Sequence, residues 1–208
     1  MGFYNDHILP CVCDLAMRNK HLRPYRERAI GAAEGRVIEI GIGSGRNLPF
    51  YRPPVKEVLA LEPSPKLIAM ARHALHPGVP VNFIEASAEA IPLEDRSVDT
   101  VVTTWTLCSI PEAATALSEM RRVLRPNGRL LFVEHGMAPD ENVRRWQDWL
   151  TPAWKRIGGG CHLNRPIRTM IESAGFRIDR LEAGYMPGPR PMTFMYEGIA
   201  RPNPGMNP

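Results

Sequence analysis

Five short apolar runs recur along the first two thirds of the chain, and each has the length of a buried strand. These runs cover residues 36–40, 57–61, 80–84, 98–103 and 129–134. Segments with helical spacing of apolar residues lie between most of them, notably 64–75 and 112–124. Buried strands that alternate with helices are typical of a doubly wound, mainly parallel sheet. The pattern therefore predicts an α/β fold.

Helical segments are expected on both sides of this core. Residues 5–34 predict one or two helices ahead of the first strand, although Pro10 and Pro24 blur their boundaries. We expect this leader to pack over the mouth of a ligand site. Residues 141–158 predict an inserted helical segment that is broken near Pro152.

The C-terminal part adds two strands to the sheet, which would bring the total to seven. A helix is expected over 164–174, ending at Gly175. Residues 176–183 and 192–200 predict a strand pair around a Pro-Gly-Pro turn, and the proline-rich tail from Arg201 is expected to be loosely ordered.

The most specific local pattern is the loop after the first apolar run. Three glycines alternate in Gly41-Ile42-Gly43-Ser44-Gly45, and Glu39 precedes them. Glycines at this spacing let the backbone turn sharply and let a ligand approach the main chain. A dinucleotide fingerprint needs a glycine where Arg46 stands. The loop therefore favours a nucleoside-bearing ligand and argues against NAD.

The second apolar run ends in Glu62-Pro63-Ser64. A carboxylate at the tip of the second strand is where an α/β nucleotide site binds ribose hydroxyls. Ser64 is expected to cap a helix that begins at Pro65.

Together these motifs resemble the class I methyltransferases that use S-adenosylmethionine (SAM). The resemblance covers roughly residues 35–135 and rests on five ordered motifs: Glu39 to Gly45, Glu62, Ala88-Glu89, Asp99 to Thr104 and Leu124 to Gly128. It implies a Rossmann-like fold with SAM as cofactor. The methionine part would lie on the glycine loop, the ribose on Glu62 and the adenine beside Ala88 and Glu89. The implied cofactor-binding residues are Glu39, Gly41, Gly43, Ser44, Gly45, Asn47, Glu62, Pro63, Ser64, Ala88, Glu89 and Thr104.

A second resemblance extends over most of the remaining chain. It rests on Cys108-Ser109, Glu134-His135-Gly136, Trp146, Asp148, Pro152-Ala153-Trp154 and residues 160–165. These residues are similar to those of the thiol S-methyltransferases of the methyltransferase-like group. The resemblance implies S-methylation of a small thiol such as hydrogen sulfide or an alkyl thiol. N-methylation of a phospholipid amine, C- or O-methylation of a quinone precursor, and SAM binding without catalysis stay open as alternatives.

Acceptor groups must follow the fourth and fifth strands, because open α/β sheets bind ligands at the carboxyl ends of their strands. The candidate catalytic residues are His135, Glu134 and Cys108. The candidate substrate-binding residues are Trp105, Leu107, Met137, Trp154 and Cys161. The Glu-His pair could orient a substrate or accept a proton, or His135 could simply satisfy a backbone group. A thiol acceptor, already a few per cent thiolate at neutral pH, requires no strong general base.

These interpretations divide one domain of 208 residues into four parts. We expect a helical N-terminal cap over 1–34, a SAM-binding core over 35–135, a helical substrate insertion over 136–165, and a C-terminal helix and strand pair over 166–200.

Composition restricts location and partners. No apolar run approaches the about 20 residues that span a membrane, and a secretory start is not evident. The four cysteines (Cys11, Cys13, Cys108, Cys161) lack the usual metal-site spacing, so we expect reduced thiols in the cytoplasm and no metal.

The net charge of +4 concentrates near the N-terminus. It is typical of a solvated helix face, with an acidic substrate or peripheral contact with an anionic membrane as alternatives. Nucleic-acid binding is disfavoured because aromatic residues do not interleave the basic ones, and the sequence does not indicate an oligomeric state.

Overall fold

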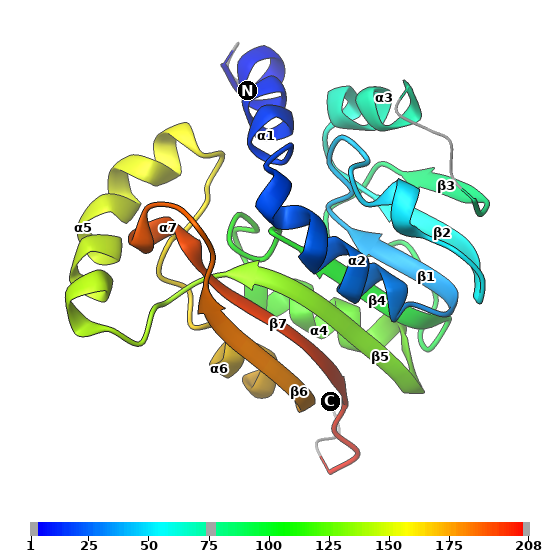
Figure 1. Ribbon diagram of the computed structural model, residues 1–208. Coiled ribbons are helices and arrows are strands. Elements are labelled where there is room, and N and C mark those ends of the chain that lie inside the picture. The colour runs from blue at the N-terminus through cyan, green and yellow to red at the C-terminus, as the bar shows by residue number, and fades with distance from the viewer. Residues whose placement is uncertain (1–3, 74–77, 206–208) are drawn as a thin grey trace.

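The computed structural model describes residues 4–73 and 78–205, and these residues build one seven-stranded sheet of strand order β3-β2-β1-β4-β5-β7-β6 (Figure 1). The strands are β1 Gly35–Ile40, β2 Val55–Leu61, β3 Val81–Ile84, β4 Val98–Thr104, β5 Leu124–His135, β6 Phe176–Tyr185 and β7 Phe194–Pro202. The first five run parallel, while β7 is antiparallel to both β5 and β6. The predicted fold class is confirmed.

Helices cover both faces of the sheet. The α-helices are α1 Leu9–Ala16, α2 Arg23–Gly31, α3 Pro65–His73, α4 Ala113–Val123, α5 Glu141–Ile157, α6 Ile167–Ser173 and α7 Arg190–Thr193. Short helical turns, η1 Tyr4–Ile8, η2 Lys20–Leu22 and η3 Leu48–Phe50, complete the set. The expected helix over 64–75 extends to residues 74 and 75, which lie outside the described residues.

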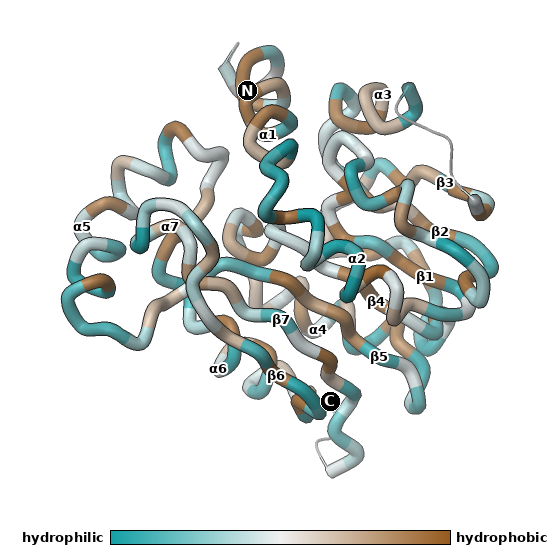
Figure 2. Tube along the Cα trace, in the orientation of Figure 1, coloured by the Kyte–Doolittle hydropathy of each residue, from teal (hydrophilic) through white to brown (hydrophobic). Residues whose placement is uncertain are grey.

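Two apolar cores form, one on each side of the sheet. On one side, Leu117 and Met120 of α4 and Ile171 of α6 pack against the central strands. On the other side, Ile30 of α2 and Ala71 of α3 pack against β1 and β2. Apolar segments accordingly gather in the middle strands in Figure 2. Because both faces are buried, the parallel strands are continuous apolar runs, which is why the sequence revealed them so clearly.

The expected break of the insertion at Pro152 is wrong, since α5 runs unbroken through this residue. One helical face of α5, formed by Val143, Gln147 and Thr151, is buried and anchors the helix. Pro152 itself is exposed, as is Asp148 one turn earlier, so water can satisfy the carbonyl group that the missing proline N–H leaves free.

Several predicted boundaries also differ. Strand β5 begins at Leu124, which already pairs with Val98, so it includes the turn that we expected before residue 129. Helix α6 begins at Ile167 and not at residue 164. The tail from Arg201 is not loose at its start, because Pro202 still pairs with Phe176 in the sheet. Within the described residues, none of the helices combines the length and apolar character needed to cross a bilayer.

Candidate active site

The glycine loop lies between β1 and η3, and each of its glycines adopts a positive φ (68°, 56° and 79° for Gly41, Gly43 and Gly45). Their surroundings differ. A Cβ at Gly41 would meet the Thr106 side chain at 2.5 Å, and one at Gly45 would meet the Ala71 backbone at 3.1 Å. A Cβ at Gly43 would meet nothing within 4 Å. Gly41 and Gly45 thus allow close packing, whereas Gly43 exposes backbone to a space where a ligand can lie.

Glu62 joins the glycine loop to the end of β2. Its carboxylate accepts hydrogen bonds from the backbone N–H groups of Gly43 (3.0 Å) and Ser64 (3.1 Å), and the side chain is buried. Burial raises the pKa of Glu62, while the two backbone N–H donors counteract that shift. The remaining lone pairs of its two oxygens suit a vicinal diol such as ribose. Ser64 caps α3 as predicted, with Leu67 N–H 3.4 Å from its Oγ, and Pro63 is exposed.

A buried network of polar side chains lies next to the glycine loop. The Glu39 carboxylate accepts hydrogen bonds from Asn47 Nδ2 (2.6 Å) and from the Tyr51 hydroxyl (2.8 Å). Asn47 Nδ2 also donates to Thr104 Oγ1 at 2.8 Å. Burial raises the pKa of Glu39 to about 7. Three predicted cofactor residues, Glu39, Asn47 and Thr104, therefore come together, and Glu39 acts here mainly as a support for its neighbours.

The N-terminal leader reaches the same loop through Asp14. This buried carboxylate of α1 accepts hydrogen bonds from Ser44 Oγ (2.6 Å), Arg46 Nε (2.8 Å) and Arg18. Burial alone would raise the pKa of Asp14, but these three donors outweigh it and lower the pKa. The leader is thus tied to the cofactor loop. Three apolar side chains of the leader, Ile8 of η1 and Val12 and Leu15 of α1, are exposed.

Arg26 of α2 is a second leader residue that the sequence analysis missed. Its Nε donates to Asn47 Oδ1 at 2.9 Å, and its guanidinium lies 4.9 Å from the centre of the Trp105 ring. Burial lowers the pKa of Arg26 to about 10. Arg26 belongs to a basic run that looks like a solvated helix face, and Asp14 stands outside any motif, so no local pattern marks either residue.

The two residues that we expected beside the adenine, Ala88 and Glu89, lie after β3. Ala88 is buried, and the Glu89 carboxylate accepts from Ser87 Oγ (2.9 Å) and from the backbone N–H of Glu112 (2.8 Å). Glu89 therefore connects this turn to the start of α4, while Ala88 supplies an apolar wall.

On the acceptor side, Glu134 is fully buried at the end of β5. Its Oε1 accepts from Thr103 Oγ1 (2.8 Å) and from the backbone N–H groups of Thr106 (3.1 Å) and Leu107 (3.2 Å). Its Oε2 has no hydrogen-bond partner among the described residues. Burial raises the pKa of Glu134 to about 7. Glu134 thus holds the loop that follows β4.

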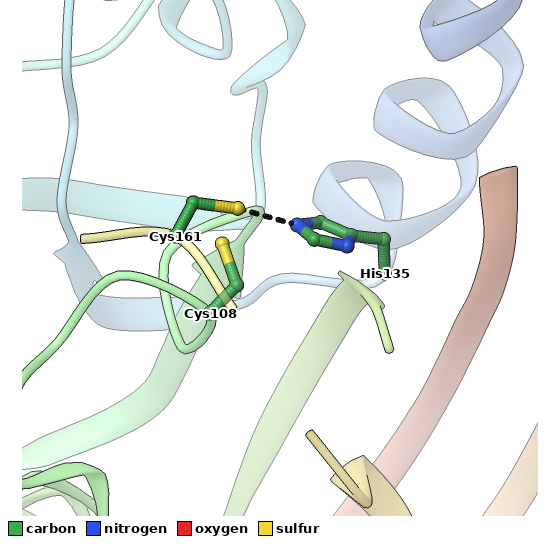
Figure 3. Close-up of side chains that lie close together, drawn as sticks. All are labelled: Cys108, His135 and Cys161. Carbon is green, nitrogen blue, oxygen red and sulfur yellow. Dashed lines mark hydrogen bonds between the residues drawn. The ribbon is translucent and has the colours of Figure 1, made fainter. Parts of the chain in front are cut away.

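His135 comes next and faces two thiols (Figure 3). Its Nε2 lies 3.2 Å from Cys161 Sγ, and its buried Nδ1 has no partner within the described part of the chain. Burial alone would lower the pKa of His135, but the hydrogen bond to Cys161 and the nearby Cys161 and Glu134 charges raise it. The hydrogen bond with Cys108 and burial raise the pKa of Cys161. The neighbouring His162 does not face this thiol, because its Nδ1 lies 3.1 Å from the carbonyl oxygen of Cys108.

The other substrate candidates differ in position. Leu107 is fully buried, and Trp105, which has a φ of 52°, is partly buried with its Nε1 unpartnered among the described residues. Met137 is partly buried at the start of the insertion, with its N–H 2.9 Å from the Arg165 carbonyl oxygen. Trp154 lies on α5 against Gly158. The structure therefore brings Trp105, Leu107 and the Cys–His cluster to the ends of β4 and β5.

Two further tryptophans of α5 do not line this site. Trp146 and Trp149 are 56% and 71% exposed and contact each other edge to face, with ring centroids 5.5 Å apart. Their exposure shows that these two rings do not pack in the core.

The strand order, the glycine loop with Gly43 facing open space, and the carboxylate at the end of β2 are features of class I SAM-dependent methyltransferase domains. Comparison with known families agrees, because residues 38–132 match the model described as "Methyltransferase domain". A SAM-dependent methyltransferase from Leishmania major has the same fold, with a TM-score of 0.70 and 18% identity over 95% of this chain and 80% of that chain.

Among curated proteins, the chain resembles the thiol S-methyltransferase TMT1B of Rattus norvegicus. The two are 39% identical over 155 residues, which make up 70% of this chain and 62% of the rat protein. It also resembles a phosphatidylethanolamine N-methyltransferase of Cereibacter sphaeroides, with 34% identity over 54% of this chain and 57% of that protein. The chain thus spans less than two thirds of the length of these relatives.

Proposed function

We propose that this protein transfers a methyl group from SAM to a small-molecule acceptor, and that the acceptor is a thiol. The observation that carries the choice of acceptor is the state of the two titratable groups at the ends of β4 and β5. Glu134 accepts three hydrogen bonds from the end of β4 and the loop that follows it, and His135 is hydrogen-bonded to a protein thiol. Neither is arranged as a strong general base, and a thiol needs none.

The residues around the glycine loop position the cofactor in this proposal. SAM supplies an electrophilic methyl group on a sulfonium. The backbone at Gly43 and the Glu62 carboxylate bind the methionine and ribose parts, and Glu39, Asn47 and Asp14 hold these groups in place. We assign Glu134 a positioning role, because it contacts Thr106 and Leu107 and not an open space.

On the acceptor side, Leu107 and Trp105 exclude water while His135 faces the reacting sulfur. A thiolate that attacks a sulfonium gives two neutral products, and an apolar environment favours this loss of charge. The protein therefore acts mainly by orientation and desolvation.

A phospholipid amine or a quinone precursor is the alternative acceptor. The Cereibacter relative and the exposed apolar side chains of α1 and α5 favour a lipid-like molecule. An amine acceptor, however, requires carboxylates or an aromatic cage around its cation. Glu134 does not offer such a carboxylate, because it is buried and accepts hydrogen bonds from Thr103, Thr106 and Leu107.

The test is release of S-adenosylhomocysteine from SAM with four acceptors: hydrogen sulfide, an alkyl thiol, phosphatidylethanolamine vesicles and a demethylated quinol. We expect turnover with the two thiols, and the Gly43→Val variant supplies the blank. Turnover only with the vesicles or the quinol would refute the thiol assignment. Binding of SAM without turnover of any acceptor would indicate a non-catalytic SAM-binding protein.

A further inference from the structure

Three metal-ligating side chains from separate segments converge at the acceptor end of the sheet (Figure 3). Cys108 follows β4, His135 ends β5, and Cys161 follows α5. Their two Sγ atoms and one imidazole nitrogen all lie within 4.8 Å of one another. The sequence analysis predicted no metal because no two of these residues are close in the chain.

The spacing of these atoms suits a tetrahedral ion. Zinc–sulfur bonds of about 2.3 Å and zinc–nitrogen bonds of about 2.0–2.1 Å place two sulfurs about 3.8 Å apart and sulfur and nitrogen about 3.6 Å apart. Cys161 Sγ and His135 Nε2 are 3.2 Å apart, and the whole set lies within 4.8 Å. Shifts of about 1 Å or less would therefore bring all three atoms onto one ion.

We propose that Cys108, His135 and Cys161 bind a divalent ion of the zinc type through Cys108 Sγ, Cys161 Sγ and His135 Nε2. Two thiolates and one imidazole are ligands for such a borderline-soft ion. Three protein ligands leave the fourth position open, which is the arrangement of catalytic zinc sites and not of structural ones.

The surrounding contacts hold the two cysteines close together before any ion binds. His162 N–H donates to the Cys108 carbonyl oxygen at 2.8 Å, so the backbones that carry Cys108 and Cys161 are joined. Arg165 donates to the carbonyl oxygens of Leu107 and Ile110, which fixes the loop on either side of Cys108. The imidazole of His135 turns its Nε2 toward the two sulfurs, and its buried Nδ1 has no partner among the described residues.

The open position would take the acceptor's sulfur, and this step rests on the thiol acceptor proposed above. The acceptor thiol loses its proton to solvent as its sulfur binds the ion. A lone pair of that sulfur then forms the new bond to the methyl carbon. The carbon–sulfonium bond breaks, and its electron pair stays on the sulfur of S-adenosylhomocysteine. The thioether leaves the ion, and no electron is gained or lost overall.

The site is tested by adding Co²⁺, a spectroscopic substitute for Zn²⁺, to the reduced, metal-free protein. We expect sulfur-to-cobalt charge-transfer absorption that saturates at one ion per chain and disappears when Zn²⁺ is added. Cys108→Ser and Cys161→Ser should each weaken binding at least tenfold. Cys11→Ser is the matched control, because Cys11 is exposed on α1, and it should bind normally. Absence of the absorption, or equal absorption in Cys108→Ser, Cys161→Ser and the control, would overturn the proposal.

Thiol alkylation of the unsubstituted protein gives a second measurement that does not depend on the folding of a variant. Zn²⁺ should protect Cys161, the more exposed of the two cysteine ligands, from alkylation and leave Cys11 unprotected. Equal labelling of Cys161 with and without Zn²⁺ would contradict the site. Metal binding and thiol turnover are also separable. Cobalt absorption without thiol methylation would support the metal site and refute the proposed thiol acceptor. Thiol methylation without cobalt absorption or zinc protection would support the thiol acceptor and refute the metal site.

Discussion

Replacing Glu39 with glutamine should change how the stability of the protein depends on pH. The Glu39 carboxyl group is fully buried, and its pKa is raised from 4.5 to about 7. The folded state therefore holds a proton that the unfolded state has already lost between these two values. Because the unfolded state binds fewer protons in this window, stability falls as pH rises from about 4.5 to about 7 and then levels off.

The size of this effect follows from the two pKa values. Ionisation of Glu39 should cost the folded state about 2.5 kcal/mol more at pH 8 than at pH 5. Glutamine does not ionise, and it can accept from Asn47 and donate to the Tyr51 hydroxyl, which are the present partners of Glu39. Between pH 5 and pH 8, the free energy of unfolding of Glu39→Gln should therefore rise by about 2.5 kcal/mol relative to that of the unsubstituted protein.

Urea unfolding of both proteins at pH 5, 6, 7 and 8, followed by circular dichroism, measures this difference. Glu134 also has a pKa raised to about 7, but it is present in both proteins, so the difference reports Glu39 alone. A difference in unfolding free energy that stays constant from pH 5 to pH 8 would show that Glu39 remains ionised in the fold. That result would refute the reasoning.

Three further substitutions test the cofactor site. Gly43→Val should abolish SAM binding in calorimetry, because the valine side chain would enter the open space beside the loop. Gly184→Val is the control and should bind SAM normally, since a Cβ at Gly184 also meets nothing within 4 Å. Retained micromolar affinity in Gly43→Val would mean that the loop is only a turn. Glu62→Ala should weaken SAM binding by about 1.5–3 kcal/mol through loss of charged hydrogen bonds, and unchanged affinity would place the ribose elsewhere. Asp14→Ala should destabilise the protein by about 1–3 kcal/mol and speed proteolysis of the N-terminal segment, since Ser44 loses its acceptor; equal proteolysis rates would contradict the tie between leader and loop.

Much of the fold could be predicted because the parallel strands are buried on both faces. Their apolar runs and the glycine loop are local signals, and they identified β1 to β5 and the cofactor loop. Pro152 misled the prediction of α5, because a proline breaks a helix only where its missing hydrogen bond and its ring cannot be accommodated. An exposed proline on a helix anchored through its opposite face does not meet that condition.

The site was less predictable, because several of its contacts join residues far apart in the chain. Asp14 reaches Ser44, Arg26 reaches Asn47, and Cys161 reaches His135. None of these pairs has a characteristic spacing, and each depends on how the leader or the insertion folds back over the sheet. The basic charges of the leader were therefore interpreted as solvent-facing, although Arg26 among them is buried beside the glycine loop.

The most direct test of thiol methylation is the identity of the methylated product. The protein is incubated with SAM that carries a deuterated methyl group and with an alkyl thiol, and the products are separated and analysed by mass spectrometry. The proposal predicts the methyl thioether of that thiol carrying the intact labelled methyl group, formed together with S-adenosylhomocysteine and absent with Gly43→Val. Labelled methyl groups found only on a lipid amine or a quinol, or no labelled product while SAM stays bound, would contradict it.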